Sequence, residues 1–97
     1  MAEFKFKDGS TVEISLGEDC YNVHLHKEDD GTLKMSTYTD FKLLCEDIGR
    51  TFFHTPYVDE FPILSECLKK IHPNPKYPKR YILTTLRLAA LNISCYN

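Results

Sequence analysis

The hydrophobic pattern of this 97-residue chain changes its period near residue 38. Up to that point apolar and polar side chains alternate, which is the pattern of strands with one buried face. Asp-Gly pairs at residues 8–9 and 30–31 interrupt the alternation, and glycine supplies the positive φ that a tight hairpin turn needs. A third turn falls at residues 17–19. We therefore expect four antiparallel strands, at about residues 3–7, 11–16, 20–27 and 32–38.

The same alternation predicts which side of the sheet each side chain faces, because successive residues of a strand point to opposite faces. One side is mostly apolar and is expected to face the core: Phe4, Phe6, Val12, Ile14, Leu16, Tyr21, Val23, Leu25, Leu33 and Met35. The other side is mostly polar and is expected to face solvent: Lys5, Glu13, Ser15, Asn22, His24, His26, Lys34, Ser36 and Tyr38.

After residue 38 the apolar side chains recur at helical spacing. The first helix should begin at Thr39 or Asp40, since either residue can cap it. We expect Gly49 to end this helix early and to leave residues 50–57 as a connector. A second helix should begin near Asp59.

The second helix should carry Pro62 in its first turn, where a missing N–H costs nothing. The three prolines of residues 72–78 forbid a helix there. Pro78 fits the first turn of a third helix that ends near Ile93. These elements predict an α+β protein of one domain, residues 1–97, in which a four-stranded antiparallel β-meander (residues 1–38) is packed on one face by two or three helices (residues 39–97).

Charge is divided unevenly along the chain. Residues 1–66 carry all 14 carboxylate side chains and six cations, a net of −8, whereas residues 67–97 carry six cations and no carboxylate side chain. Two interpretations are open. The basic segment can neutralise acidic loops of the same molecule, or it can form an anion-binding or partner-binding surface.

A partner-binding surface is the more specific of the two interpretations, and two sequence features support it. Tyrosines interleave with the cations near the start of the third helix, where free N–H groups attract anions. That helix is also apolar on two sides, so it is either sandwiched or exposes a docking patch. Leu88 and Leu91 lie on the side away from the main apolar stripe, which consists of Ile82, Leu83, Leu86, Ala89, Ala90 and Ile93. The candidate partner- or anion-binding residues are Lys69, Lys70, Lys76, Tyr77, Lys79, Arg80, Tyr81, Thr84, Arg87, Leu88 and Leu91.

No pattern in the chain is typical of catalysis, of a cofactor or of a metal site. His24 and His26 could share a metal on one strand, but no third ligand is evident, so we expect none. The cysteines at positions 20, 45, 67 and 95 match no zinc pattern. We expect reduced cysteines in a cytoplasmic protein, since the charged first ten residues do not resemble a secretory signal.

We therefore expect a small non-catalytic binding or regulatory protein that docks onto a macromolecular partner. An accessory or inhibitor role suits this size, including the roles of proteins from mobile elements such as phages. The partner would be another protein, or a second copy of this chain, since exposed sheet edges invite pairing. The alternative is a nucleic-acid-binding protein that uses residues 69–87. No apolar run is long enough to predict a membrane partner.

Overall fold

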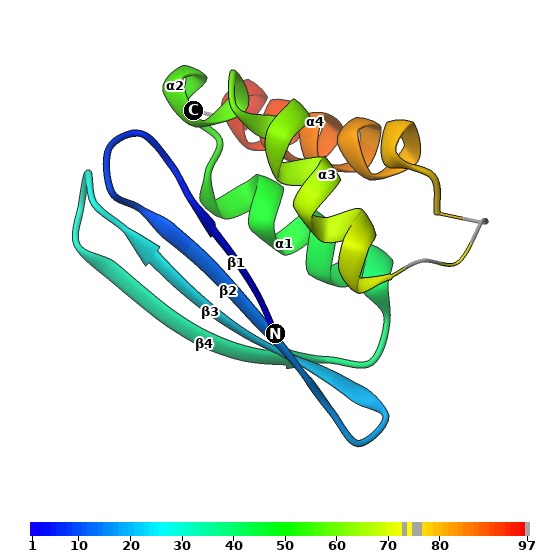
Figure 1. The fold of residues 1–97 in the computed structure, drawn as a ribbon. Coiled ribbons are helices and arrows are strands. Elements are labelled where there is room, and N and C mark those ends of the chain that lie inside the picture. The colour runs from blue at the N-terminus through cyan, green and yellow to red at the C-terminus, as the bar shows by residue number, and fades with distance from the viewer. Residues whose placement is uncertain (73, 75–76, 97) are drawn as a thin grey trace.

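Four antiparallel strands are followed by four helices in the computed structural model, which describes residues 1–72, 74 and 77–96, the last three without their side chains (Figure 1). The strands form one sheet in the order β1-β2-β3-β4. Their bounds are β1 Ala2–Lys5, β2 Thr11–Gly17, β3 Cys20–Lys27 and β4 Thr32–Tyr38. Gly9 and Gly31 both have positive φ, as the hairpin prediction requires. The predicted α+β class is confirmed.

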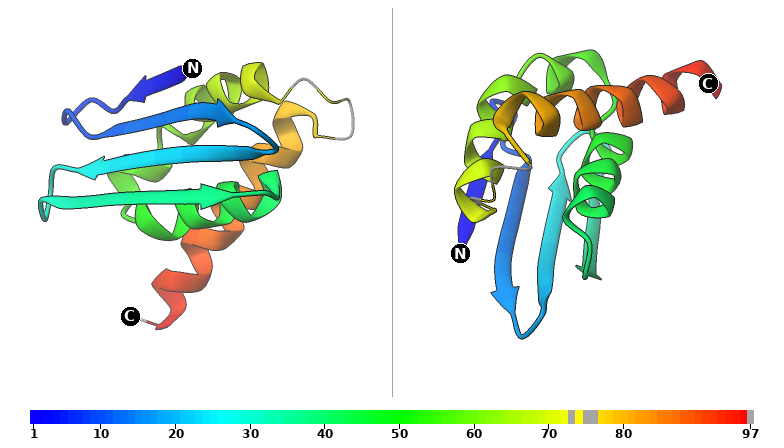
Figure 2. Two further views of the ribbon diagram at one scale, coloured as in Figure 1. Left: turned by 90° about the horizontal axis from the view of Figure 1, so that it is seen from below. Right: turned by 90° about the vertical axis from the view of Figure 1, so that its right-hand side faces the viewer.

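The helices form two layers on one side of the sheet. Their bounds are α1 Phe41–Thr51, α2 Thr55–Val58, α3 Phe61–Ile71 and α4 Lys79–Tyr96. Helices α1 and α3 pack on one face of the sheet, and α4 packs on α1 and α3 on the side away from the sheet (Figure 2). The sheet therefore keeps one uncovered outer face, and α4 keeps an outer face of its own.

The observed helix ends agree only in part with those predicted from the capping residues. Asp40 caps α1 as predicted, because its carboxylate accepts the Lys42 N–H at 2.9 Å. Pro62 lies in the first turn of α3, also as predicted. The residue that precedes α3 is Glu60, whereas Asp59 closes the short α2. Helix α2 itself lies in the segment that we expected to be an irregular connector.

Strand β4 presents the opposite side chains to the core from those predicted. The prediction that Leu33 and Met35 face the core is wrong, because 78% and 76% of their surface is exposed. They pair with His26 and His24 of β3 and lie with them on the outer face. The outer face is therefore partly apolar.

The cause is the length of the connection between β3 and β4. Lys27 pairs with Thr32, so four residues separate the strands. An even number of connecting residues places odd-numbered side chains of β3 on the same face as even-numbered side chains of β4. The side chains that this register turns toward the helices are three that we expected to face solvent: Lys34, Ser36 and Tyr38.

A carboxylate on α1 receives the polar side chains of β4. Lys34 Nζ donates to both oxygens of Asp47 at 2.7 and 2.8 Å, and the Tyr38 hydroxyl donates to the same carboxylate. The Asp47 side chain is only 14% exposed. Partial burial and the bond to Asp47 raise the pKa of Tyr38. This network fastens the edge strand to α1.

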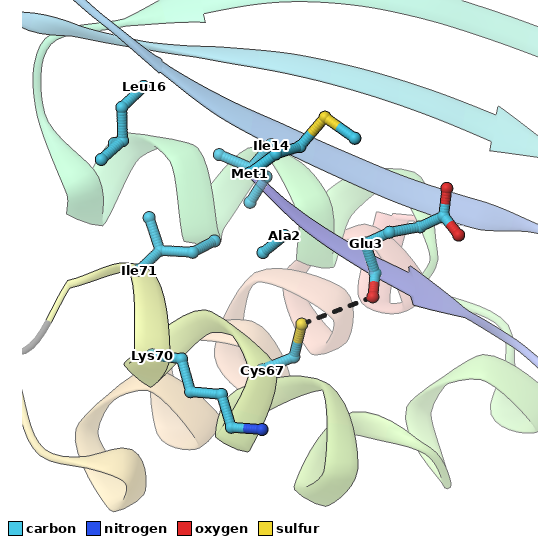
Figure 3. Close-up of a pocket in the computed structure, with 8 residues that line it drawn as sticks. All are labelled: Met1, Ala2, Glu3, Ile14, Leu16, Cys67, Lys70 and Ile71. Carbon is cyan, nitrogen blue, oxygen red and sulfur yellow. Dashed lines mark hydrogen bonds between the residues drawn. The ribbon is translucent and has the colours of Figure 1, made fainter.

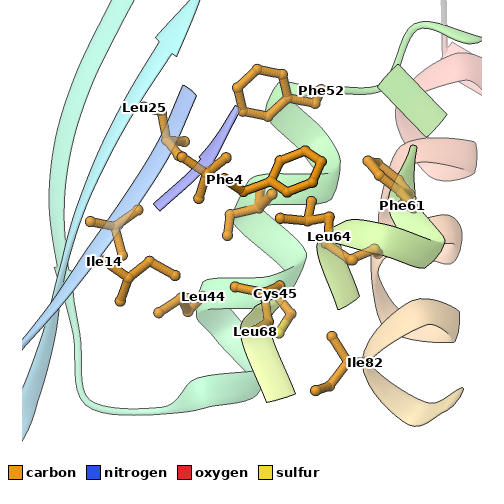
Figure 4. Close-up of a cluster of buried hydrophobic side chains, with 14 of the residues drawn as sticks. Phe4, Ile14, Leu25, Leu44, Cys45, Phe52, Phe61, Leu64, Leu68 and Ile82 are labelled. Carbon is orange, nitrogen blue, oxygen red and sulfur yellow. The ribbon is translucent and has the colours of Figure 1, made fainter. Parts of the chain in front are cut away.

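Buried aromatic and aliphatic side chains fill the space between the sheet and the helices (Figure 4). The Phe6 ring packs on the rings of Phe52 and Tyr57, with centroids 4.7 and 5.1 Å apart. Cys45 is a buried core residue, and burial raises the pKa of its thiol to about 12. Such a thiol stays protonated and unreactive at neutral pH.

Gly49 permits the close approach of α1 and α4. The helix continues through Gly49 to Thr51, so the prediction that Gly49 ends α1 is wrong. A Cβ placed on this residue would lie 2.5 Å from the Leu86 carbonyl oxygen and 2.9 Å from the Ala89 Cβ. Glycine is present here because the backbone of the neighbouring helix leaves no room for a side chain.

We predict that Gly49→Ala destabilises the protein by about 1–2 kcal/mol. Alanine gains about 1 kcal/mol in helix propensity, but overpacking against a backbone carbonyl costs more, about 1–3 kcal/mol or above. Urea unfolding would measure the change. Ile63→Ala, an exposed position of α3, is the matched control and should shift stability by less than about 0.5 kcal/mol. A stabilised Gly49→Ala variant would contradict this packing.

A hydrogen-bond network ties the first hairpin to the rest of the fold. The buried Ser10 hydroxyl accepts the Glu28 N–H at 2.9 Å and contacts the Tyr57 hydroxyl at 3.1 Å. Tyr57 in turn donates to Asp8 at 2.6 Å. Partial burial acts to raise the pKa of Asp8, but the hydrogen bonds from Tyr57 and Ser10 outweigh it and lower that pKa.

We predict an acid-labile contribution to stability from Asp8. Its pKa is lower in the folded than in the unfolded protein, so its stabilisation is present above the unfolded value of about 3.9 and is lost as pH falls through the folded value. The urea midpoint of Asp8→Asn should therefore change less between pH 5 and pH 2.5 than that of the wild type. Asp19→Asn, in an exposed turn, should keep the wild-type pH dependence.

Candidate functional site

Helix α4 has a buried inner face and an exposed outer face. It contains neither glycine nor proline, and the Pro78 carbonyl accepts the N–H groups of Tyr81 and Ile82 at its start. The side chains that face α1 and α3 are buried: Ile82, Thr85, Leu86, Ala89 and Ala90. This inner face anchors α4 and fixes the direction of the outer face.

The outer face carries exposed leucines between arginines. Leu88 and Leu91 are 55% and 56% exposed, although leucine is usually buried. We call the outer residues the α4 surface: Arg80, Tyr81, Thr84, Arg87, Leu88 and Leu91. All six are exposed and all six belong to the predicted site. The helical periodicity that separated Leu88 and Leu91 from the inner stripe is therefore confirmed.

A groove of about 220 Å³ adjoins this surface where α4 crosses α1. From α4 it is lined by Thr85, Leu88, Ala89 and Asn92, and from α1 by Lys42, Glu46 and Arg50. The α1 residues were missed by the sequence prediction. Their spacing of four residues places them on one helix face, but nothing in the sequence indicates that α4 lies beside that face.

Positive charge predominates on the α4 surface and on the α1 side of the groove. Within the described residues, neither Arg80 nor Arg87 forms an ion pair, and Lys42 and Arg50 on the α1 side form none. Glu46 contributes a carboxylate to the same rim. These features suit a binding partner whose surface is apolar and carries carboxylates. It would cover the exposed leucines, fill the groove and pair with these cations.

The cations that precede Arg80 are not gathered on this surface. Lys79 pairs with Glu66 at 2.6 Å, and Lys69 donates to the Asn74 carbonyl at 2.8 Å. Lys70 lies near β1, at a separate cavity. Lys76 lies outside the described residues. The six predicted cations therefore do not form one continuous stripe along the part of the chain that the structure describes.

Tyr77 belongs to an aromatic cluster instead of standing free. Its ring contacts His72, Tyr81 and Phe41, with centroids 5.0, 5.4 and 5.8 Å away. Burial, with a smaller effect of Lys69, lowers the pKa of His72. Tyr77 is half-buried, so its ring is already packed on other rings and is poorly placed to stack on a nucleotide base.

The outer face of the sheet differs from its prediction. Asn22 and His24 lie there, but Tyr38 faces the helices and binds Asp47. His26 lies 3.6 Å from Glu28. Among the described residues, no three His, Cys, Asp or Glu side chains converge in an arrangement that could hold a metal ion.

Comparison of the chain with protein-family models, with curated proteins and with solved structures gives no match. None of the described helices has the length and hydropathy needed to cross a membrane.

We predict that the exposed leucines of α4 contribute little to folding. Leu88→Gln combined with Leu91→Gln should lower the free energy of unfolding by less than about 1 kcal/mol, because glutamine matches leucine in helix propensity and these sites are half exposed. Leu86→Ala, on the buried face, should cost about 2–5 kcal/mol. Urea unfolding of both variants would test this contrast, and equal losses would contradict it.

Proposed function

We propose that this protein is a small non-catalytic binding protein whose α4 surface and adjoining groove dock an acidic amphipathic helix of another protein. One observation carries the proposal. Two leucines more than half exposed lie on the α4 surface with two arginines, and one of them, Leu88, lines a groove whose rim holds Lys42 and Arg50. None of these cations has an ion-pair partner among the described residues. An apolar stripe with carboxylates at its edges would fill the groove and pair with the arginines.

Charge supports a heterologous partner over a second copy at this surface. A two-fold contact through α4 would bring identical patches together. The α4 surface carries two arginines and no carboxylate, so such a contact would bring two positive patches together without an opposite charge, which is unfavourable. An acidic partner has no such cost.

The arrangement also favours a protein over a nucleic acid. A nucleic-acid platform needs a continuous row of cations and free aromatic rings. Here Lys79 is paired with Glu66, Tyr77 is packed in a cluster, and the centre of the surface is apolar. Docking of this kind would occlude part of the partner, which suits an accessory or inhibitor role.

Binding of a designed peptide would test the proposal. We expect a fluorescent Leu/Glu amphipathic helix of about 18 residues, or five turns, to bind, and the same helix with lysine in place of glutamate to bind at least about tenfold more weakly. Leu88→Gln with Leu91→Gln should weaken binding at least about tenfold, because burial of each leucine is lost. Fluorescence anisotropy measures both effects.

Matched variants separate this surface from the rest of the molecule. Leu33→Gln with Met35→Gln removes two apolar side chains, even more exposed than Leu88 and Leu91, from the outer sheet face and should leave peptide affinity unchanged. Arg87→Gln should weaken binding about two- to fivefold and reduce its salt dependence. Equal affinity for the Glu and Lys peptides, or no binding, would overturn the proposal. Tight, salt-sensitive binding of a single-stranded oligothymidylate would instead favour the nucleic-acid alternative.

A further inference from the structure

A cavity of about 370 Å³ lies at the opposite end of the molecule from the α4 groove, where the end of α3 approaches β1 and β2 (Figure 3). Its walls are mostly apolar: Met1, Ala2, Ile14, Leu16 and Ile71. Cys67 and Lys70 on α3 and Glu3 on β1 complete the lining. Its volume falls within the range of small-molecule sites.

The cavity exists because the helices do not cover the whole inner face of the sheet. Leu16 lies on that face, paired with Tyr21, yet 63% of its surface is exposed. The β2–β3 hairpin extends past the helices at this end (Figure 1). Ala2 has too small a side chain to fill the gap opposite Ile14. An apolar wall therefore remains open to solvent.

Lys70 lines the cavity and carries its cation. Its ammonium points away from Leu16 and Ile71 (Figure 3), so pairing with a ligand on the apolar wall requires this exposed side chain to change rotamer. The nearest carboxylate one turn earlier on α3 is that of Glu66, which already accepts a bond from Lys79 at 2.6 Å. Within the described residues, Lys70 forms no ion pair. The Glu3 carboxylate points away from Leu16 and Ile71, whereas its carbonyl accepts the Cys67 thiol at 3.7 Å (Figure 3).

We propose that this cavity binds an aliphatic carboxylate, with the hydrocarbon chain against Ile14, Leu16 and Ile71 and the carboxylate paired with Lys70. A cavity of about 370 Å³ has room for a medium-length aliphatic chain, and decanoate is the reference ligand. The proposal is independent of the α4 surface, because the two sites share no residue.

A chain-length series of free carboxylates tests the apolar wall. Calorimetry should show affinity rising from hexanoate to octanoate to decanoate by up to about fourfold per methylene. The rise should stop once the chain exceeds the cavity. Decanol and decylammonium should bind more weakly than decanoate, because neither can pair with an ammonium group.

Two lysine variants test the charge. Lys70→Gln should weaken decanoate binding about two- to fivefold, the range for an exposed ion pair, and should leave decanol binding unchanged. Lys5→Gln removes an exposed cation of β1 outside the cavity and should change neither affinity. Both substitutions are at exposed positions, so circular dichroism should show an unchanged fold.

Cys67 gives a readout at the site itself. Burial raises the pKa of this thiol, so its alkylation by N-ethylmaleimide should be slow, and bound decanoate should slow it further. Cys20, on the outer face of the sheet, should react at the same rate with and without decanoate. Peptide mass spectrometry distinguishes the two thiols.

The proposal is overturned if decanoate gives no saturable heat and no protection of Cys67, or if decylammonium binds as tightly as decanoate. Leu88→Gln with Leu91→Gln should bind decanoate as the wild type does. Failure of this proposal therefore leaves the α4 proposal untouched, and the reverse also holds.

Discussion

The close crossing of α1 and α4 at Gly49 is the constraint on which the rest of the arrangement depends. Because no side chain separates the helices there, the inner face of α4 packs tightly on α1 and α3. That contact determines that Leu88 and Leu91 face solvent and that the cations of α1 border the same groove as Leu88. A looser crossing would widen the groove and turn the outer face.

Much of the fold could be predicted from local patterns. Alternation and Asp-Gly turns predicted the four strands, and helical spacing predicted α1, α3 and α4. The same periodicity separated Leu88 and Leu91 from the inner stripe of α4. These features depend on residues close in sequence, where period and turn chemistry are informative.

The remainder depends on contacts between distant segments. The face of β4 follows from a four-residue connection, which hydrophobicity alone assigned wrongly for Leu33 and Met35. The groove forms because Lys42 and Arg50 of α1 lie beside α4. Lys79 is paired because Glu66 of α3 lies within reach of it. No local sequence pattern indicates which helices lie side by side, so the groove residues on α1 were not predicted.

The bond between Lys34 and Asp47 has a consequence for folding fidelity. If β4 shifted by one residue, Leu33 and Met35 would become buried, which hydrophobicity favours. Lys34 would then leave the Asp47 carboxylate in a nearly closed site without its cation. The cost in free energy exceeds that of leaving a carboxylate at the surface unpaired. Asp47 thus selects the native alignment over a competing one that would bury more apolar surface.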